Sequence, residues 1–308
     1  MAYSIPARRM KLGVIPSLSE EEELGRALHY TELRDMARAA EDVGFDSLWL
    51  ADHTLYRAPG QPESGSWEVF SVLSALAATT RRITLGPLVA CTSFRNPALL
   101  AKMADTLDEI SGGRFILGLG AGWHEPEYTA FGYPFDNLAS RFEEALKIIV
   151  PLLREGHVNF EGTYYQARDC VLRPRGPSKA GPPIWIGASR PRMLRLTAKY
   201  ADAWNTVWHR SPEGVAKVYP PFVEACREVG RDPETITLTA GTLAHVLGPG
   251  EQRKPDAKGI GGAPEEVARA LRGFADVGVK HLIVIVEPGD LTGIERFGRV
   301  IELLDQMG

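Results

Sequence analysis

Two groups of polar side chains stand directly behind short apolar runs and could carry acid–base chemistry. Asp52 and His53 end the run SLWLADH, and His124 and Glu125 follow the run FILGLGAGW. An imidazole with a pKa near ~6.5 both gives and takes protons near neutrality, and carboxylates serve as general acids and bases. An isolated Asp-His pair is often a surface turn, but its place at a strand end favours a function. His53, Glu125 and His124 are therefore the candidate catalytic residues.

A third group lies between an apolar run and a predicted helix and consists of Gly187, Ala188, Ser189 and Arg190. Free N–H groups at a helix N-terminus bind phosphate, and a guanidinium adds a second attraction. We therefore predict an anion site at this turn. A plain N-cap is the alternative role for Ser189.

A glycine run, Gly118-x-Gly120-x-Gly122, lies in the middle of the chain. Its spacing differs from the GxGxxG pattern of a dinucleotide-binding loop, which also needs an acidic residue after a second strand. We interpret the run as small residues that let a ligand or a neighbouring strand approach the backbone closely.

Four histidines, His53, His124, His209 and His245, follow or end predicted strands and raise the question of a metal site. The chain contains no HxH or HxxxH pair, and its first predicted strand ends without a histidine. We therefore expect no metal. The nucleophile elbow GxSxG is also absent, so a hydrolase triad is not expected.

The composition is that of an ordinary globular protein. The chain has 308 residues, 44% of them hydrophobic and 24% charged, with 35 Lys+Arg against 39 Asp+Glu and a net charge of −4. This mild acidity argues against a nucleic-acid partner or an anionic membrane surface, and no apolar run is long enough to span a membrane. Three cysteines without CxxC spacing and the lack of a signal-peptide pattern predict a reduced, cytoplasmic protein.

Short apolar runs alternate with amphipathic patterns along the whole chain. Several runs are apolar at consecutive positions, as strands are when helices cover both faces of a parallel sheet. The eight runs predicted as strands are residues 11–16, 47–53, 83–91, 115–123, 183–189, 202–208, 236–247 and 281–288.

The segments between these runs have the 3.6-residue period of helices. In 96–112 apolar residues recur at spacings of three and four, with Pro97 as a start signal and Gly112 as a stop signal. The segments 31–44 and 294–304 show the same period. Eight strands that are each followed by a helix predict an α/β fold, a (β/α)8 TIM barrel, with all 308 residues in a single domain.

Two segments interrupt this alternation. Residues 124–183 hold a helix at 141–156 and a hairpin around Glu161-Gly162, so we predict an insertion after the fourth strand. Residues 248–262 are rich in Gly, Pro and Lys and are predicted as a mobile loop after the seventh strand. Both follow the carboxyl ends of barrel strands, where barrel enzymes carry their chemistry, and we expect them to form walls and a lid.

Five stretches of the chain together carry a family pattern. The most specific one is NPALLAKMADTLDEISGGRFILGLGAGW (96–123), and the others are AAEDVGFDSLWLADH, LSALAATTRRITLGPLV, PPIWIGASRPRMLRLTAKYADAWN and GAPEEVARALRGFADVGVKHLIV. They resemble the bacterial luciferase-like family of flavin- and deazaflavin-dependent oxidoreductases over nearly the whole chain. The resemblance implies a barrel with an insertion, a homodimer, and a cofactor bound at the carboxyl ends of the strands.

The resemblance offers two cofactors. We favour coenzyme F420, used for hydride transfer to or from a small organic substrate, because of the Asp52-His53 pair and the GAGWHEPEYTAFGYPF block. The alternative is a two-component monooxygenase that uses FMNH2 and O2. By resemblance, His53 lies against the ring as proton donor or acceptor, with Asp52 beside it, and Gly122 and Trp123 belong to the cofactor site. Some deazaflavin sugar dehydrogenases have a Glu where this chain has Trp123, so that general acid is absent here.

The resemblance also implies three further features. A non-proline cis peptide between Leu88 and Val89 forms a bulge in the third strand that backs the ring. The phosphate end of the cofactor binds the turn at 187–190. A separate flavin or F420 reductase is an expected partner. A barrel metallohydrolase and a non-catalytic flavin-binding protein are the remaining alternatives.

Overall fold

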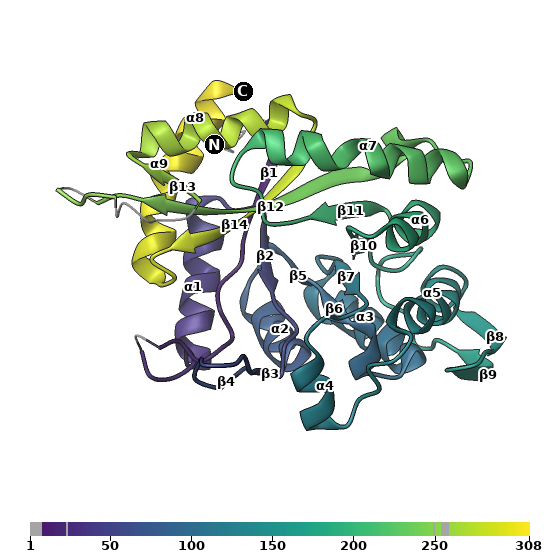
Figure 1. Cartoon of the computed structure of the whole chain (residues 1–308). Coiled ribbons are helices and arrows are strands. Elements are labelled where there is room, and N and C mark those ends of the chain that lie inside the picture. Colours follow the sequence, from purple (N-terminus) through teal and green to yellow (C-terminus); the bar gives the residue numbers. More distant parts are fainter. Residues whose placement is uncertain (1–7, 23, 249, 254–258) are drawn as a thin grey trace.

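The computed structural model describes residues 8–308 except 23, 249 and 254–258. Parallel strands form the central sheet, and those that make up the barrel wall each lie within a run that the sequence predicts as a strand (Figure 1). In chain order they are β1 (Lys11–Val14), β2 (Ser47–Leu50), β5 (Thr84–Pro87), β6 (Ala90–Cys91), β7 (Leu117–Gly120), β10 (Ile184–Gly187), β11 (Ala203–Thr206), β12 (Thr237–Val246) and β14 (His281–Glu287).

The sheet curls into a nearly closed barrel with the order β5-β2-β1-β14-β12-β11-β10-β7-β6. β5 and β6 are two halves of the third predicted strand, separated by Leu88 and Val89. β6 pairs with β7, and Leu85 of β5 bridges Phe115 just before β7, which brings the two edges together. The predicted TIM barrel is confirmed, and so is the cis peptide Leu88–Val89. A second non-proline cis peptide, Val207–Trp208, was not predicted.

Helices follow the strands and cover the outside of the barrel (Figure 1). The ends of α3 show why the sequence signals work. The Asn96 side chain accepts hydrogen bonds from the N–H groups of Ala98 and Leu99, and Gly112 ends the helix in the left-handed region at φ 66°. The ring contains α1 (Tyr30–Val43), α2 (Val69–Thr79), α3 (Pro97–Ser111), α5 (Leu138–Glu155), α6 (Pro191–Tyr200), α7 (Pro212–Glu228), α8 (Pro264–Asp276) and α9 (Leu291–Met307).

Apolar side chains fill both sides of the sheet. On β2, Leu48 and Leu50 belong to the core between strands and helices, whereas Trp49 belongs to a second cluster inside the barrel. There its ring lies 4.5 Å, between centroids, from that of Trp185. The neighbouring strand β5 leaves room for this ring, because a Cβ on Gly86 would lie only 2.8 Å from a carbon of Trp49. Side chains therefore fill the barrel interior at this level, as in other barrels, whose ligands bind at the carboxyl ends of the strands.

The segment after β7 combines a barrel helix with two additions. α5 packs against α3 and α6 and so completes the ring, while the short helix α4 (Glu125–Phe131) and an antiparallel hairpin are extra. The hairpin consists of β8 (His157–Glu161) and β9 (Gln166–Val171), which confirms the predicted hairpin.

Part of the predicted mobile loop 248–262 lies outside the described residues, namely 249 and 254–258. Its last residues form β13 (Ile260–Gly262), which pairs in parallel with the end of β12. Another short pair, β3 (Leu55–Tyr56) with β4 (Ser64–Gly65), follows β2.

Candidate active site

His53 and the first turns of α4 meet beyond the carboxyl ends of β2 and β7. Nδ1 of His53 lies 2.9 Å from Oε1 of Glu127, and the N–H of Thr54 donates to Oε2 of Glu127 at 2.9 Å. The ring of Tyr56 lies 4.3 Å from the imidazole, and Trp123 meets the imidazole edge-on at 5.7 Å. His53 is half-buried and Glu127 is buried. The structure thus holds one imidazole between a carboxylate and two aromatic rings.

Asp52 is occupied by partners within the protein. Arg95 donates to its two oxygens at 2.6 and 3.1 Å, and the N–H of Cys91 donates to Oδ2 at 2.9 Å. Arg95 also donates to Glu68, the N-cap of α2, at 2.6 Å. The Asp52 carboxylate therefore ties the end of β2 to β6 and α2. Direct contact of Asp52 with a cofactor stays a prediction.

The bulge between β5 and β6 fits into a wall of glycines. A Cβ on Gly118 would lie 2.1 Å from the carbonyl oxygen of Pro87, and one on Gly120 would lie 2.5 Å from Val89. On the next strand, a Cβ on Gly187 would still stand 3.4 Å from Val89. The interpretation that small residues allow a close approach of strands is confirmed for Gly118 and Gly120.

Gly122 and Trp123 lie between β7 and α4. Gly122 has φ 82°, and the Tyr128 hydroxyl occupies the space that a Cβ would need. That hydroxyl lies 2.9 Å from the thiol of Cys91, whose pKa is raised to about 12 by burial. Cys91 is thus a neutral packing residue and not a nucleophile. Trp123, by contrast, is 67% exposed, so its indole is available to a ligand.

The other two candidate catalytic residues occupy different environments at the start of α4. His124 is buried, and its Nε2 accepts a hydrogen bond from the N–H of Arg57 at 3.1 Å. One nitrogen of His124 is therefore already engaged in holding the loop after β2. Glu125 is exposed on the first turn of α4.

The predicted anion site lies between β10 and α6. Ser189 and Arg190 are exposed, and Arg190 is the N-cap of α6 without a side-chain capping bond. The alternative in which Ser189 caps this helix is therefore wrong, because the helix begins one residue later. The turn is open to solvent, as an anion site requires, and the site itself stays a prediction.

The other histidines near the mouth of the barrel, which is the end formed by the carboxyl ends of the strands, do not come together at one point. Nε2 of His209 lies 2.9 Å from the Thr206 hydroxyl, and burial lowers the pKa of His209. His245 shares a face of β12 with Gly241, and its Nε2 is buried without a hydrogen-bond partner among the described residues. In the described part of the chain, no three His, Cys, Asp or Glu side chains come close enough to hold a metal.

Sequence reasoning missed Glu127. On a helix Glu125 lies about 60° around the axis from Tyr128, whereas Glu127 lies about 100° away, so helical spacing alone favours Glu125 as the carboxylate on the buried face. The structure instead buries Glu127 together with Tyr128 and leaves Glu125 exposed. Arg95 was missed because nothing in its local sequence points to Asp52.

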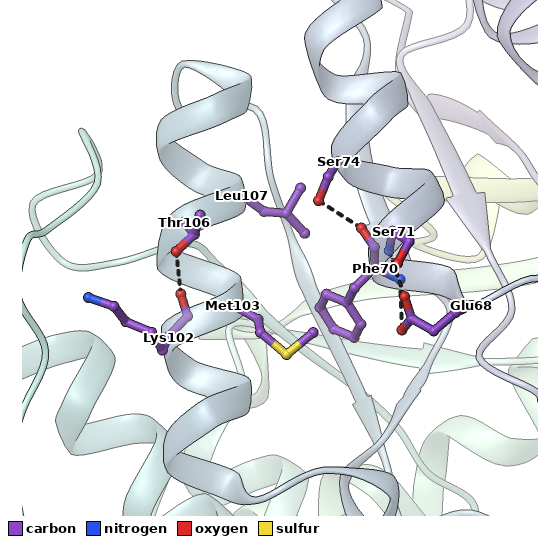
Figure 2. A pocket seen from close by; sticks show the side chains of 8 residues that line it. All are labelled: Glu68, Phe70, Ser71, Ser74, Lys102, Met103, Thr106 and Leu107. Carbon is purple, nitrogen blue, oxygen red and sulfur yellow. Dashed lines mark hydrogen bonds between the residues drawn. The ribbon is translucent and has the colours of Figure 1, made fainter.

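A surface groove of about 240 Å³ lies elsewhere, between α2 and α3 on the outside of the barrel. Figure 2 shows Phe70 from α2 and Met103 from α3 facing one another across it. This groove contains none of the predicted catalytic or cofactor-binding residues.

The fold and the polar groups at the strand ends define a (β/α)8-barrel protein with a histidine–carboxylate pair beside an exposed indole. A family model described as luciferase-like monooxygenase matches residues 10–257. The chain therefore belongs to the luciferase-like monooxygenase family, as the sequence resemblance indicates.

Two curated relatives and one solved structure are similar to this chain. The F420-dependent glucose-6-phosphate dehydrogenase of Microbacterium testaceum is 33% identical over 213 residues, covering 67% of this chain and 61% of that protein. The phthiodiolone/phenolphthiodiolone dimycocerosates ketoreductase of Mycobacterium tuberculosis is 31% identical over 225 residues, covering 67% and 59%. The chain thus spans about three-fifths of the length of these relatives. A structure of an F420-dependent secondary alcohol dehydrogenase matches with a TM-score of 0.78 at 20% identity, covering 96% and 99%.

Proposed function

We propose that this chain is an F420-dependent oxidoreductase that interconverts an alcohol and a carbonyl compound. The observation that carries the proposal is the half-buried His53, held by Glu127 beside the exposed Trp123 at the carboxyl ends of the strands. Family membership and the names of the two relatives, a dehydrogenase and a ketoreductase, support it.

The mouth of the barrel fits a flat ring cofactor with a phosphate-bearing tail. Val89, which packs against the glycines of β7, would lie behind the ring, and Gly122 and Trp123 would border it. The buried Nε2 of His245 has no hydrogen-bond partner among the described residues, as expected where a ligand completes a site.

The tail of the cofactor would reach the turn between β10 and α6. Gly187 and Ala188 lie at its base, and the exposed Ser189 and Arg190 offer a hydroxyl and a guanidinium to a phosphate. The backbone N–H groups at the start of α6 face the same anion.

The chemistry of the proposal divides between cofactor and protein. A bound deazaflavin would supply hydride transfer, from the C–H carbon of the alcohol or to the carbonyl carbon of the product, and the residues of β7 and the turn between β10 and α6 would hold it. His53 takes the hydroxyl proton when the alcohol is oxidised and gives a proton to the carbonyl oxygen when the carbonyl compound is reduced. The protein further orients the substrate and restricts access of water.

Binding experiments distinguish F420 from FMN. The purified protein is titrated with each cofactor, oxidised and reduced, and quenching of fluorescence is followed. We expect saturable binding of F420 and oxidation of a secondary alcohol that stops when F420 is withheld. Tight binding of FMN without binding of F420 would refute the proposal and favour the FMNH2-dependent monooxygenase.

We also propose a homodimer formed through the outer faces of α2 and α3. Leu99 and Ile110 on α3 are 53% and 43% exposed, beside the apolar groove of Figure 2. Large exposed side chains in such a patch favour burial against a partner. Light scattering should give twice the mass of one chain, and Leu99→Glu should halve it. A monomeric wild-type protein would refute this.

Cysteine state and net charge support a cellular compartment and a kind of substrate for the proposed enzyme. The three cysteines are free, which supports the reducing cytoplasm, and the net charge of −4 supports a small-molecule substrate over nucleic acid. None of the described helices is both long and apolar enough to cross a bilayer. A separate F420 reductase would supply the reduced cofactor.

A further inference from the structure

Glu127 is a buried carboxylate whose two oxygens are both used on one loop. Its side chain comes from α4 and is almost fully buried. Oε1 lies 2.9 Å from Nδ1 of His53, and Oε2 accepts from the Thr54 N–H at 2.9 Å and from the Thr54 hydroxyl at 3.2 Å. These contacts join residues 73 or 74 positions apart in sequence. Because both carboxylate oxygens are engaged, Glu127 holds His53 and Thr54 in one geometry.

The protonation of Glu127 decides which nitrogen of His53 carries a proton. Burial by itself raises the pKa of Glu127, but the hydrogen bonds from His53 and Thr54 outweigh burial and hold that pKa below its ordinary value. Glu127 is therefore ionised near neutrality and can only accept hydrogen bonds. Nδ1 of His53 must then donate, which leaves the lone pair of neutral His53 on Nε2.

The other charged and titratable groups near His53 do not compete for its nitrogens. The Tyr56 ring packs against the imidazole at a tilt of 36°, and burial raises the pKa of Tyr56, so its hydroxyl stays neutral. His124 lies behind Tyr56 and accepts from Arg57, while Asp52 is paired with Arg95. Among the described residues, Glu127 is the only hydrogen-bond partner of the His53 side chain.

We propose that Glu127 is a positioning residue that fixes His53 in the Nδ1–H tautomer and so presents Nε2 as the proton-transfer atom. The inference rests on the proposed function for its catalytic consequence, but the tautomer itself is a property of the protein alone. When Nε2 takes the proton of an alcohol, the adjacent carboxylate stabilises the imidazolium, and it does so without moving.

Glu127→Gln tests this role with little change of shape. The amide oxygen can still accept from Thr54, and the amide N–H2 then faces Nδ1 of His53. Because an amide N–H2 can only donate, Nδ1 must now accept, and the proton of neutral His53 moves to Nε2. The variant therefore folds with the imidazole in the wrong tautomer, a change that costs about 10⁴-fold in turnover in the serine-protease triad.

The experiment combines NMR of the cofactor-free protein with kinetics. Histidine is labelled with ¹⁵N, and the His53 signals are assigned by their loss in His53→Asn. We expect protonated Nδ1 in the neutral wild-type protein, protonated Nε2 in Glu127→Gln, and a fall in kcat of about 10²–10⁴-fold with KM and F420 affinity within threefold. Glu295→Gln, which changes an exposed carboxylate on α9, is the matched control and should match wild type.

Several results would overturn the proposal. Wild-type His53 with its proton on Nε2 would do so without any variant. An unchanged tautomer or near-normal kcat in folded Glu127→Gln would do the same, and a loss confined to Glu125→Gln would assign the role to the exposed carboxylate instead. Failure of wild type to bind F420 would refute the proposed function, while the NMR result would still decide the tautomer.

Discussion

His281 should make the fold sensitive to acid because the barrel interior holds it in the neutral form. The indole N–H of Trp49 donates to the Ser47 hydroxyl at 2.7 Å, so the Ser47 proton is left for Nε2 of His281, also 2.7 Å away. Nε2 therefore accepts, and protonation would remove this bond. Burial, followed by the charges of Lys11 and Arg8, lowers the pKa of His281 to about 3.

The magnitude follows from linkage. In the unfolded chain a histidine has a pKa near ~6.5, so below that pH the unfolded state binds a proton that the folded state rejects. The stabilisation is complete above pH ~6.5 and is lost as the pH falls toward 3, at about 1.4 kcal/mol per pH unit. Between pH ~7.5 and ~4.5 the loss amounts to about 2.7 kcal/mol, a large part of the ~5–15 kcal/mol that stabilises a typical domain.

Urea unfolding of wild type and His281→Gln at several pH values measures this loss. The glutamine amide oxygen can take the place of Nε2 as acceptor for Ser47, and it does not titrate. We expect wild type to be the more stable protein at pH ~7.5 by about 1 kcal/mol, and its advantage to shrink by about 2.7 kcal/mol and reverse by pH ~4.5. Parallel pH profiles for the two proteins would refute the reasoning.

Two further predictions concern the mouth of the barrel. Gly118→Ala should lower the free energy of unfolding by about 1–3 kcal/mol, because the new Cβ would lie 2.1 Å from the backbone oxygen of Pro87. Gly187→Ala should lower it by less than ~1 kcal/mol, because its Cβ would lie 3.4 Å from Val89. Denaturation midpoints of the two variants compare these losses, and equal losses would contradict the prediction. His53→Asn keeps a donor for the buried carboxylate but removes Nε2, so kcat should fall about 10²–10⁴-fold with F420 affinity retained. Weakened binding with normal single-turnover chemistry would reduce His53 to a binding residue.

Much of the fold was predictable because its signals are local. The consecutive apolar residues of β14 indicate a strand covered on both faces, and Asn96, Pro97 and Gly112 mark the ends of α3 within a residue of where they lie. The hairpin after α5 was predicted from Glu161-Gly162 in the same way. These signals depend only on neighbouring residues, so they can be recognised without the tertiary structure.

The candidate site was predictable only in part. That polar residues at strand ends gather at one mouth follows from the barrel topology, and this brought attention to His53. The sequence predicted His124 and Glu125, which follow the fourth apolar run, and it did not predict Glu127. The orientation of α4 in the fold buries Glu127 together with Tyr128 and brings its carboxylate to His53.

The sequence by itself thus determined the barrel, the family and the position of the mouth. Tertiary structure alone decided the pairs that join different strand ends: His53 with Glu127 and Asp52 with Arg95. The physical reason is the distance along the sequence over which each kind of interaction acts. Periodicity and capping act over a few residues, whereas the partners in these pairs are 74 and 43 positions apart and meet only when the barrel closes.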